Sequence, residues 1–312
     1  NTFNCENEFY KKGLAITPVK FGISFTTSFL NQAGALINVY KDGTVLVNHG
    51  GTEMGQGLHT KIMQIAALEF GIGVNEVKVN ATSTAKVPNT SATAASAGTD
   101  LNGMAVKNGI EKLKLRISRV LENEFNKRHY NSGKPSKDSD FVFAEGEVYD
   151  KKNPKRKLKF QEAVTIAYMN QVSLSATGYY KTPDINFNRK TGKGKPYYYY
   201  AFGMAVTEVL LDTLTGYYKN LRTDILHDAG ESINPRMDIG QVEGGYIQGV
   251  GWCTTEECKW DEKGNLLNHS PDTYKIPTIQ DIPKDFRVTL LEDHPNAAHT
   301  IRRSKAVAEP PL

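Results

Sequence analysis

The chain has 312 residues, of which 39% are hydrophobic and 23% are charged, and its net charge is +4. This composition is typical of a globular protein with a large core and excludes wholesale disorder. Charged, amide or glycine residues interrupt every apolar run before the ~18 residues that a membrane helix needs, so we exclude a membrane protein. The length is about twice that of a typical ~150-residue domain, which predicts two lobes.

The start of the chain and its cysteines indicate a cellular compartment. The first residues, NTFNCENEFYKKGL, lack a basic segment followed by an apolar one and so predict no secretory signal, and the missing initiator Met suggests a fragment or a processed chain. Cys5, Cys253 and Cys258 are an odd, sparse set without the spacing of zinc or iron–sulfur ligands. We therefore expect a reducing, cytoplasmic location, with cysteines that are ordinary core or surface residues.

The first predicted lobe, residues 1–124, contains a hairpin, a glycine-rich loop and a helix. Two β-rich runs flank Asp42-Gly43, a pair that supplies the positive φ of a tight turn. Residues 50–57 carry four glycines, and a helical apolar stripe follows that ends at Gly71. Main-chain N–H groups in such a loop can converge on an anion such as phosphate, although the loop lacks the pattern of known nucleotide-binding loops. A turn without any ligand stays the alternative.

A small, hydroxyl-rich segment follows at residues 88–100 (PNTSATAASAGTD). Small side chains allow backbone and hydroxyl groups to approach a polar ligand closely. The alternative is a Ser/Thr loop that caps the helix predicted to start near Asp100.

Residues 125–160 are predicted to form a basic insertion loop. Within it, residues 127–159 carry ten Lys or Arg and five acids, so this window has a charge of +5 and the rest of the chain −1. No aromatic residues alternate with a broad basic stripe, so the window favours a solvated loop over a nucleic-acid interface.

The second predicted lobe, residues 161–312, repeats the order of the first. Two β-rich runs flank a TLTG turn, and a loop then leads to a helix in which Ile239, Val242, Tyr246 and Val250 recur at helical spacing. The shared order of hairpin, polar loop and helix is a weak internal repeat. Hairpins and helices without regular βαβ alternation predict an α+β fold with two similar lobes of antiparallel hairpins packed with helices.

Few isolated side chains indicate chemistry by themselves. Glu309 stands between small apolar residues and two prolines, where a desolvated carboxylate could act as a general base; a surface Glu before a polyproline turn is the alternative. Gln241 lies in a helical pattern, where solvated polar residues are ordinary. The histidines show no metal-ligand spacing, and we expect hydrogen-bonded structural roles for His49, His59 and His227.

Several segments, taken together and in order, resemble the molybdenum-binding portion of the xanthine dehydrogenase and aldehyde oxidase family. The segments are KFGISF with NQAGA, HGGTEMGQGLHTK, PNTSATAAS with DLNG, SLSATGYYKTP, LRTDILHDAG with DIGQVEGG, DTYKIP and SKAVAEPPL. The resemblance covers the chain from about Gly13 onward, except roughly residues 124–160. It is closer to the xanthine dehydrogenases, particularly the bacterial type with a separate large subunit, and implies two molybdopterin-binding lobes.

The resemblance implies a molybdenum–pterin cofactor (molybdopterin) and a role for each matching residue. It implies Glu309 as the general base and Phe25 and Thr26 as substrate contacts. Because the pterin carries the molybdenum, it implies no metal ligand from the protein. Ala308 stands where the family has Gly, and its methyl group could crowd the site. The implied pterin contacts are Met54, Gly55, Gln56, Thr93, Ala94, Ala95, Ser96 and Gln241.

The implied reaction is hydroxylation of hypoxanthine and xanthine to urate, with water as the oxygen source. In the family, electrons leave through two-iron two-sulfur clusters and FAD to NAD, in other domains or subunits. The resemblance thus implies a purine substrate and iron–sulfur and FAD partners, and neither nucleic acid nor a membrane. An aldehyde or another N-heterocycle as substrate, or a non-catalytic pterin-binding module, are the alternatives. The family's GGGFGG and RGFG segments have no counterpart here, so we expect the chain alone to be inactive without the remainder of the molybdenum subunit.

Overall fold

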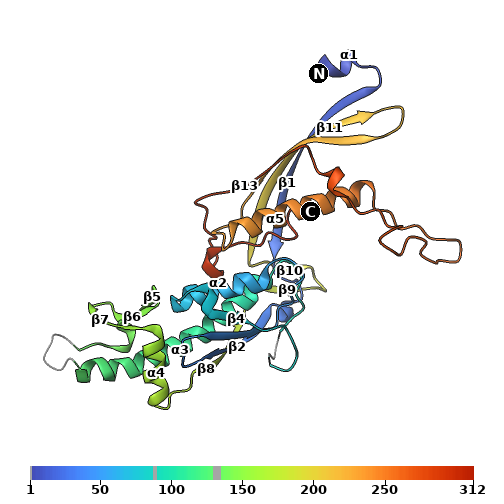
Figure 1. The fold of residues 1–312 in the computed structure, drawn as a ribbon. Coiled ribbons are helices and arrows are strands. Elements are labelled where there is room, and N and C mark those ends of the chain that lie inside the picture. The colour runs from blue at the N-terminus through green and yellow to red at the C-terminus, as the bar shows by residue number, and fades with distance from the viewer. Residues whose placement is uncertain (1, 87–89, 129–134) are drawn as a thin grey trace. The chain divides into compact units, whose positions relative to one another are not determined.

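The computed structural model describes residues 2–86, 90–128 and 135–312 (Figure 1). Pro88 and Asn89 of the small-residue segment, and residues 129–134 of the basic window, lie outside the described residues. The chain forms two compact units: a middle unit, Ser24–Tyr198, and a terminal unit that combines residues 1–23 with Tyr199–Leu312. These limits differ from the boundaries expected at residues 124 and 160, because the first long strand pairs with one that lies almost 190 residues later.

The middle unit is built around a four-stranded sheet in the order β4-β3-β2-β8. β2 is antiparallel to both β3 and β8, and β3 is parallel to β4. As predicted, Gly43 has a positive φ of 86° in the turn between β2 and β3. Its elements are β2 (Gln32–Val39), β3 (Val45–His49), α2 (Leu58–Phe70), β4 (Val77–Val79), α3 (Gly98–Arg128), β5 (Phe141–Ala144), β6 (Glu147–Asp150), β7 (Asn153–Lys159), α4 (Phe160–Met169), β8 (Ser175–Lys181), β9 (Asn186–Asn188) and β10 (Lys193–Lys195).

The core of the middle unit lies between its sheet and α2 and α3. Alternate residues of β2, including Ala35 and Ile37, are buried, and so is the apolar stripe of α2. The long helix α3 packs closely on the sheet at Gly178 of β8. A Cβ atom on this residue would overlap the carbonyl oxygen of Ala105 in α3. Close packing of the helix on the sheet therefore requires glycine at residue 178.

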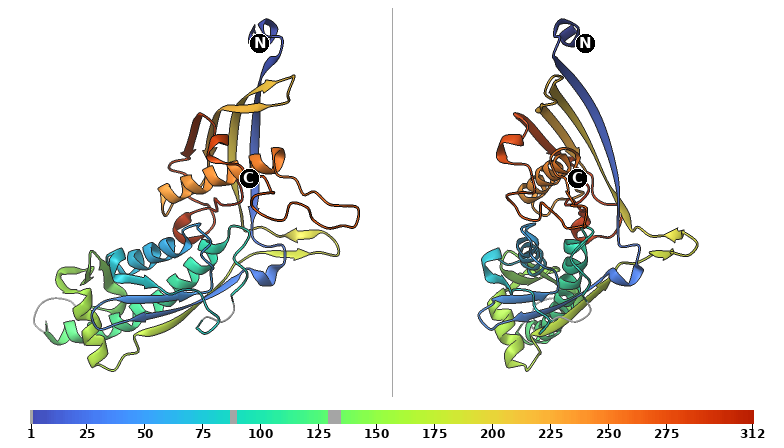
Figure 2. Two further views of the ribbon diagram at one scale, coloured as in Figure 1. Left: turned by 45° about the vertical axis from the view of Figure 1, so that its right-hand side comes forward. Right: turned by 90° about the vertical axis from the view of Figure 1, so that its right-hand side faces the viewer.

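The terminal unit has a second four-stranded sheet, in the order β1-β11-β12-β13. Three of its strands are antiparallel, and β13 joins β12 in parallel. Helix α5 packs on one face of this sheet, as both views in Figure 2 show, and its residue Val242 lies in a buried cluster with Ile225, Ala229 and Val307. The elements are α1 (Thr2–Glu6), β1 (Tyr10–Ile23), β11 (Tyr199–Asp212), β12 (Tyr218–His227), α5 (Pro235–Thr254) and β13 (Asp285–Leu290).

The two units have the same order and pairing of elements, so the repeat in the structure covers more elements than the weak repeat expected from the sequence. In each unit a hairpin (β2-β3 or β11-β12) leads through a loop into a helix (α2 or α5), and the chain then adds a parallel strand (β4 or β13) beside the second hairpin strand. A third antiparallel strand, β8 or β1, borders the first hairpin strand. The α+β fold class is confirmed, and the hairpin–loop–helix segments occupy equivalent positions in the two units.

The basic window is not an insertion loop, in contrast to the prediction. Helix α3 extends into it, and β5, β6 and β7 form a three-stranded antiparallel sheet within it. In β7 the residue that turns inward is Arg156, which is 3% exposed, lies 3.9 Å from the carboxylate of Asp150 and donates to Oγ of Ser136. Because the buried position of β7 carries a charged residue, the alternation of apolar and polar residues that predicts a strand is absent from its sequence.

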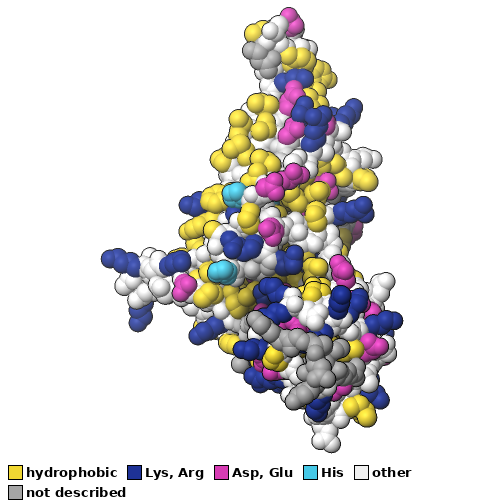
Figure 3. All heavy atoms as spheres, turned by 90° about the vertical axis from the view of Figure 1, so that its left-hand side faces the viewer, with side chains coloured by type: hydrophobic (Ala, Val, Ile, Leu, Met, Phe, Trp, Pro, Cys, Tyr) yellow, Lys and Arg dark blue, Asp and Glu magenta, His cyan; other side chains and the backbone are white. Residues whose placement is uncertain are grey.

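A second basic region lies outside that window. The hairpin β9-β10 carries exposed cations at its turn and on β10, and Figure 3 shows Lys and Arg side chains on this projecting segment. These cations are Arg189, Lys190, Lys193 and Lys195. Positive charge is therefore spread over two hairpin regions of the middle unit.

No helix in the described part of the chain is both long and apolar enough to span a lipid bilayer.

Candidate functional site

The glycine-rich loop connects β3 to α2 in the middle unit. Gly57, the residue before the helix, has φ = 77°, and Gly55 has φ = 98°. Both values lie in the left-handed region that glycine adopts readily, so the loop can turn sharply into the helix. Gly57 has no side chain with which to cap the first turn of α2, so this function falls to another residue.

Glu53 caps the helix from within the loop. Its Oε1 accepts hydrogen bonds from the backbone N–H groups of Gly55 (3.0 Å) and Gly57 (2.9 Å), and its Oε2 accepts from His59 (2.9 Å). Partial burial acts to raise the pKa of Glu53, but the three N–H bonds outweigh it and hold the pKa below its ordinary value. The anion at this helix start is therefore the protein's own carboxylate, whereas the sequence left open an external phosphate or a turn without any ligand.

Gln56 braces the same loop with both ends of its amide. Its Oε1 accepts from the Met54 N–H at 2.6 Å, and its Nε2 donates to the Thr52 carbonyl at 2.8 Å. Met54 and Gly55 lie at the exposed tip, where the Met54 side chain is 66% exposed. Among the described residues, no atom lies within 4 Å of the place that a Cβ atom on Gly55 would take. The tip thus presents backbone beside open space.

The two segments expected to bind the pterin are in direct contact. The Thr52 N–H donates to Oγ1 of Thr93 at 2.8 Å. Further along the second segment, Ala95 and Ser96 have φ values of 55° and 54°. Two consecutive non-glycine residues in the left-handed region are strained, and such strain is concentrated at functional sites. Of the predicted pterin contacts, the middle unit therefore brings together two sets: Met54, Gly55 and Gln56, and Thr93, Ala94, Ala95 and Ser96.

Asn31 holds the segment of the predicted substrate residues Phe25 and Thr26. Its Oδ1 accepts from the Phe25 N–H at 2.7 Å, and its Nδ2 donates to the Phe25 carbonyl at 2.9 Å. Asn31 is 2% exposed and lines a hollow of about 370 Å³ together with Ser28, Phe29, Gln32, Tyr179 and residues 181–185. Phe25 and Thr26 adjoin this hollow in sequence but do not line it.

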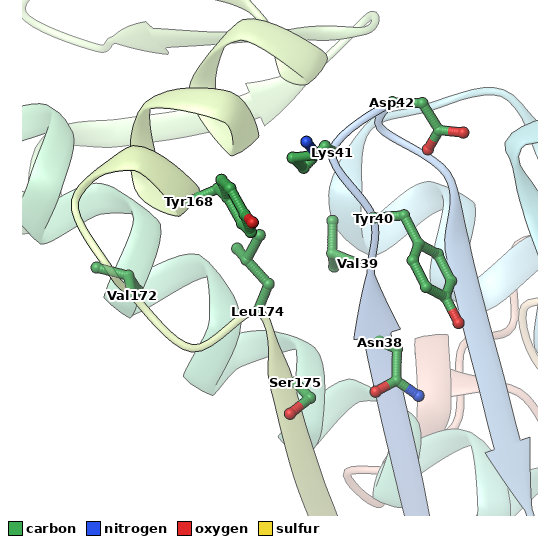
Figure 4. Close-up of a pocket in the computed structure, with 9 residues that line it drawn as sticks. All are labelled: Asn38, Val39, Tyr40, Lys41, Asp42, Tyr168, Val172, Leu174 and Ser175. Carbon is green, nitrogen blue, oxygen red and sulfur yellow. The ribbon is translucent and has the colours of Figure 1, made fainter.

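A larger hollow in the same unit contains none of the predicted site residues. It measures about 660 Å³ and lies between the β2-β3 turn and the connection from α4 to β8 (Figure 4). The Lys41 ammonium lies 4.9 Å from the centre of the Tyr168 ring. Such a cation–π contact accounts for the approach of these two segments.

His49 forms a hydrogen bond to the backbone, as expected of a structural histidine, but among the described residues the buried Nε2 atoms of His49, His59 and His227 have no hydrogen-bond partner. His49 is 1% exposed, its Nδ1 accepts the Gly51 N–H at 3.1 Å, and its ring meets that of His59 edge-on at 5.0 Å. Burial and the nearby His59 lower the pKa of His49 to about 4, so the ring is neutral at neutral pH. In the described ranges, no three His, Cys, Asp or Glu side chains lie close enough together to hold a metal ion.

In the terminal unit, α5 lies against the chain segment that carries Glu309. A Cβ atom on Gly245 would lie 3.1 Å from Cβ of Pro311 and 3.2 Å from the carbonyl oxygen of Ala308. Gln241 precedes Gly245 by one helical turn and so shares its face. The unit therefore places the half-buried Gln241 and Glu309 on the same side of α5.

Ala308 is accommodated without backbone strain. It is not one of the described non-glycine residues with positive φ, and it is half-buried. The family's glycine is therefore not required here by backbone conformation.

Backbone bonds and a buried ion pair anchor the Glu309 segment. The Lys305 N–H donates to the Ala229 carbonyl at 2.8 Å, and the Ala306 N–H donates to the Tyr199 hydroxyl at 3.0 Å. The Lys305 ammonium pairs with the Asp228 carboxylate, and the two side chains are 7% and 5% exposed. Asp228 also accepts the N–H of Gly230 at 3.0 Å.

Sequence reasoning missed the residues that support the site: Glu53, Asn31, Asp228, Lys305 and Tyr199. A signal was present for two of them. Glu53 is an acid just before an apolar helix, where negative charge is favourable. Asp228 directly follows an apolar strand run and precedes Ala-Gly, a context in which a charged side chain needs a partner. Asn31 and Tyr199 act through the backbone of distant or looped segments, which no local pattern predicts.

The fold and these loops define a class of α+β domain in which loops with exposed backbone lead into the helices that pack on the sheets. A family model described as a molybdopterin cofactor-binding domain matches residues 1–283. The chain belongs to this family of molybdopterin cofactor-binding domains.

Relatives and solved structures agree with this assignment. The chain is 47% identical to a xanthine dehydrogenase/oxidase of Gallus gallus and 46% identical to a xanthine dehydrogenase of Dictyostelium discoideum, in each case over 99% of its own length. It spans 20% and 21% of those relatives, about a fifth of their length. Both relatives are eukaryotic and leave the expected bacterial subunit type untested.

Among solved structures, quinoline 2-oxidoreductase from Pseudomonas putida 86 matches with a TM-score of 0.79 and 22% identity, over 99% of this chain and 38% of that one. Reconstituted CO dehydrogenase from Oligotropha carboxidovorans matches with a TM-score of 0.77 and 24% identity, over 97% of this chain and 36% of that one. At these identities the two structures show the fold alone.

Proposed function

We propose that the chain is the C-terminal part of the molybdenum-binding portion of a xanthine dehydrogenase. The complete protein would hydroxylate hypoxanthine and xanthine to urate, with water as the oxygen source and NAD as the final electron acceptor. The main support is the 47% identity, over 99% of the chain, to a protein named xanthine dehydrogenase/oxidase. The chain's share of that relative, 20%, makes the activity a property of the whole protein.

The residues present fit a pterin cofactor. Gly55 leaves open space at an exposed backbone turn, and the neighbouring segment of small residues is pinned to the same loop through Thr93. These features would let a flat, polar ring system approach the main chain closely. We propose that Met54, Gly55, Gln56 and Gln241 hold it, together with the segment Thr93–Ser96. When bound, the molybdenum–pterin group supplies the oxidation chemistry, because it accepts the two electrons that leave the substrate.

The chain's own side chains would bind the purine and move a proton. Phe25 would pack against the aromatic ring, and the Thr26 hydroxyl would form a hydrogen bond near it. A carboxylate oxygen of Glu309 would take a proton from the water that supplies the new oxygen. The bonds from Lys305 to Ala229 and from Ala306 to Tyr199 support this role, since they fix the segment on which Glu309 lies.

Turnover of xanthine by the full-length protein tests the proposal. Replacement of the proton acceptor, Glu309→Gln, should lower kcat by about 10²- to 10⁴-fold, the usual contribution of a general base. Glu292→Gln, at an exposed acid of the same unit, is the control and should leave kcat unchanged. Faster turnover of an aromatic aldehyde than of xanthine would contradict the proposed substrate. Bound molybdenum without any turnover would identify a non-catalytic pterin-binding module.

Partners and location follow from the same proposal. We propose that two-iron two-sulfur clusters and FAD, in other domains or subunits, carry the electrons to NAD. The remainder of the molybdenum subunit would complete the pocket. A cytoplasmic location is supported by the state of Cys5, Cys253 and Cys258, which are exposed free thiols.

A further inference from the structure

The start of α2 is filled by a side chain from the preceding loop. A helix N-terminus carries unsatisfied N–H groups and a partial positive charge, which together attract anions. Here Glu53 supplies the anion: its carboxylate accepts three backbone N–H groups at 2.9–3.0 Å. Two of the three, those of Gly55 and Gly57, belong to the loop itself, so one carboxylate fixes both the loop and the first turn of the helix.

The shape of the loop depends on this carboxylate. Gly55 and Gly57, with φ of 98° and 77°, have the largest conformational freedom of any residue type, and their N–H groups are both held by Glu53. Gln56 adds a second brace to the tip through Met54 and Thr52. Without the carboxylate, two glycines and a helix end would lose their partners together, and the tip would sample many conformations.

The same carboxylate determines which part of a ligand can lie at this helix start. An external phosphate would meet the already occupied N–H group of His59 and a carboxylate whose negative charge repels it. An uncharged ring can still approach the exposed backbone of Met54 and Gly55, beside which there is open space. The loop is therefore suited to the ring portion of a pterin, and the phosphate group must lie elsewhere.

We propose that Glu53 is a positioning residue for the pterin: it holds the Met54–Gly55 tip in the one shape that receives the ring, and it excludes the phosphate from the start of α2. This inference rests on the proposed function, because it takes the pterin as the ligand. Glu53 itself would act only through the backbone that it holds.

Cofactor content of the full-length protein tests the proposal apart from turnover. Glu53→Gln keeps the size of the side chain but removes the charge and one acceptor oxygen. We expect pterin and molybdenum per protein, measured by pterin fluorescence and by elemental analysis, to fall about tenfold, as for other residues that orient a ligand's direct contacts. Glu69→Gln, on α2 itself, should retain the wild-type content. Wild-type content in Glu53→Gln would overturn the proposal, whereas pterin-loaded wild-type protein that does not turn over xanthine would overturn only the proposed function.

A second variant separates positioning from loss of fold. In Glu53→Ala we expect the amides of Gly55, Gly57 and His59 to exchange with deuterium at least about tenfold faster, since each loses its acceptor. Added formate should occupy the vacated anion position and slow that exchange again, whereas chloride at equal ionic strength should not. Unchanged exchange in the variant, or exchange that formate does not slow in a protein of wild-type circular dichroism, would overturn the role of Glu53.

Discussion

The loop before α2 and the loop before α5 occupy equivalent places in the two units, and both follow a buried histidine at the end of a strand. The histidines are His49 and His227, each 1% exposed, and burial lowers the pKa of both. Each loop then carries an acid that accepts N–H groups of loop glycines, Glu53 in the middle unit and Asp228 in the terminal unit.

The two loops differ in how the following helix is capped. At α5, Asn234 accepts the N–H of Met237 at 3.2 Å, and a proline opens the helix. At α2 the cap position is Gly57, and Glu53 supplies the missing acceptor. Because α5 has its own cap, Asp228 is available to pair with Lys305 and thereby anchor the segment of Glu309. An acid in the loop thus shapes that loop in one unit and anchors a distant segment of the chain in the other.

Removal of the Lys305 charge should cause the largest loss of stability among the changes that test this comparison. Lys305→Met leaves the Asp228 carboxylate in a buried place, 5% exposed, without its main counter-charge. Breaking a buried pair in this way costs about 3–5 kcal/mol. Urea unfolding would measure the loss, with Lys259→Met, at an exposed pair with Glu257, as a control that should change little. Equal stability of the two variants would show that Asp228 does not depend on Lys305.

Acid should weaken the middle unit through His49. Its pKa is about 4 in the folded protein and 6.5 when unperturbed, so between these values only the unfolded chain takes up the proton. The resulting stability is complete above pH 6.5 and is lost as the pH falls toward 4, a total of about 3 kcal/mol. His49→Asn keeps an acceptor for the Gly51 N–H but does not titrate. The stability difference between wild type and variant should therefore shrink by about that amount from pH 7 to pH 4 in urea titrations, and a constant difference would refute the buried neutral ring.

Local sequence patterns predicted the parts of the fold that local forces determine. The turn at Gly43, the helix that ends at Gly71 and the helix around Val242 all follow from glycine conformations and helical apolar spacing. The pairing of β1 with β11 was not predictable in this way, since strand partners almost 190 residues apart leave no local trace. Strand β7 was missed because its buried residue is Arg156, whose charge is satisfied by a partner that only the fold supplies.

The candidate site shows the same contrast between residues in local motifs and residues that act through long-range contacts. The resemblance led to Met54 and Glu309 as predicted site residues, because these belong to recognisable motifs. It could not identify the residues that hold their segments in place. Glu53 acts on N–H groups two, four and six residues away, and Asp228 acts on a lysine 77 residues away. Such roles depend on where the fold returns the chain.

The hydroxyl of Tyr199 should contribute a smaller share of the anchoring in the terminal unit. Tyr199→Phe removes the acceptor of the buried Ala306 N–H, and an unsatisfied buried donor costs about 1–3 kcal/mol. Hydrogen exchange resolved at Ala306 would detect the change, because its amide should exchange faster while that of Lys305, which donates to Ala229, should change less. If both amides accelerated equally, the segment would be released as a whole, and the ion pair alone would not hold it.

The smallest expected effect concerns the helix caps themselves. Asn234→Ala removes the side-chain acceptor of the Met237 N–H, and loss of such a cap costs about 1 kcal/mol, whereas Asn234→Gly costs only a few tenths. Thermal unfolding of the two variants should therefore rank alanine below glycine. Glu53→Gln, by contrast, weakens the cap of α2 and leaves Gly57 unchanged. A loss of stability similar to that of Asn234→Ala would mean that the Glu53 carboxylate stabilises its helix start about as much as an ordinary N-cap side chain does. If Asn234→Ala instead cost as much as Lys305→Met, Asp228 would depend on the cap of α5, and the two loops would differ less than their hydrogen bonds indicate.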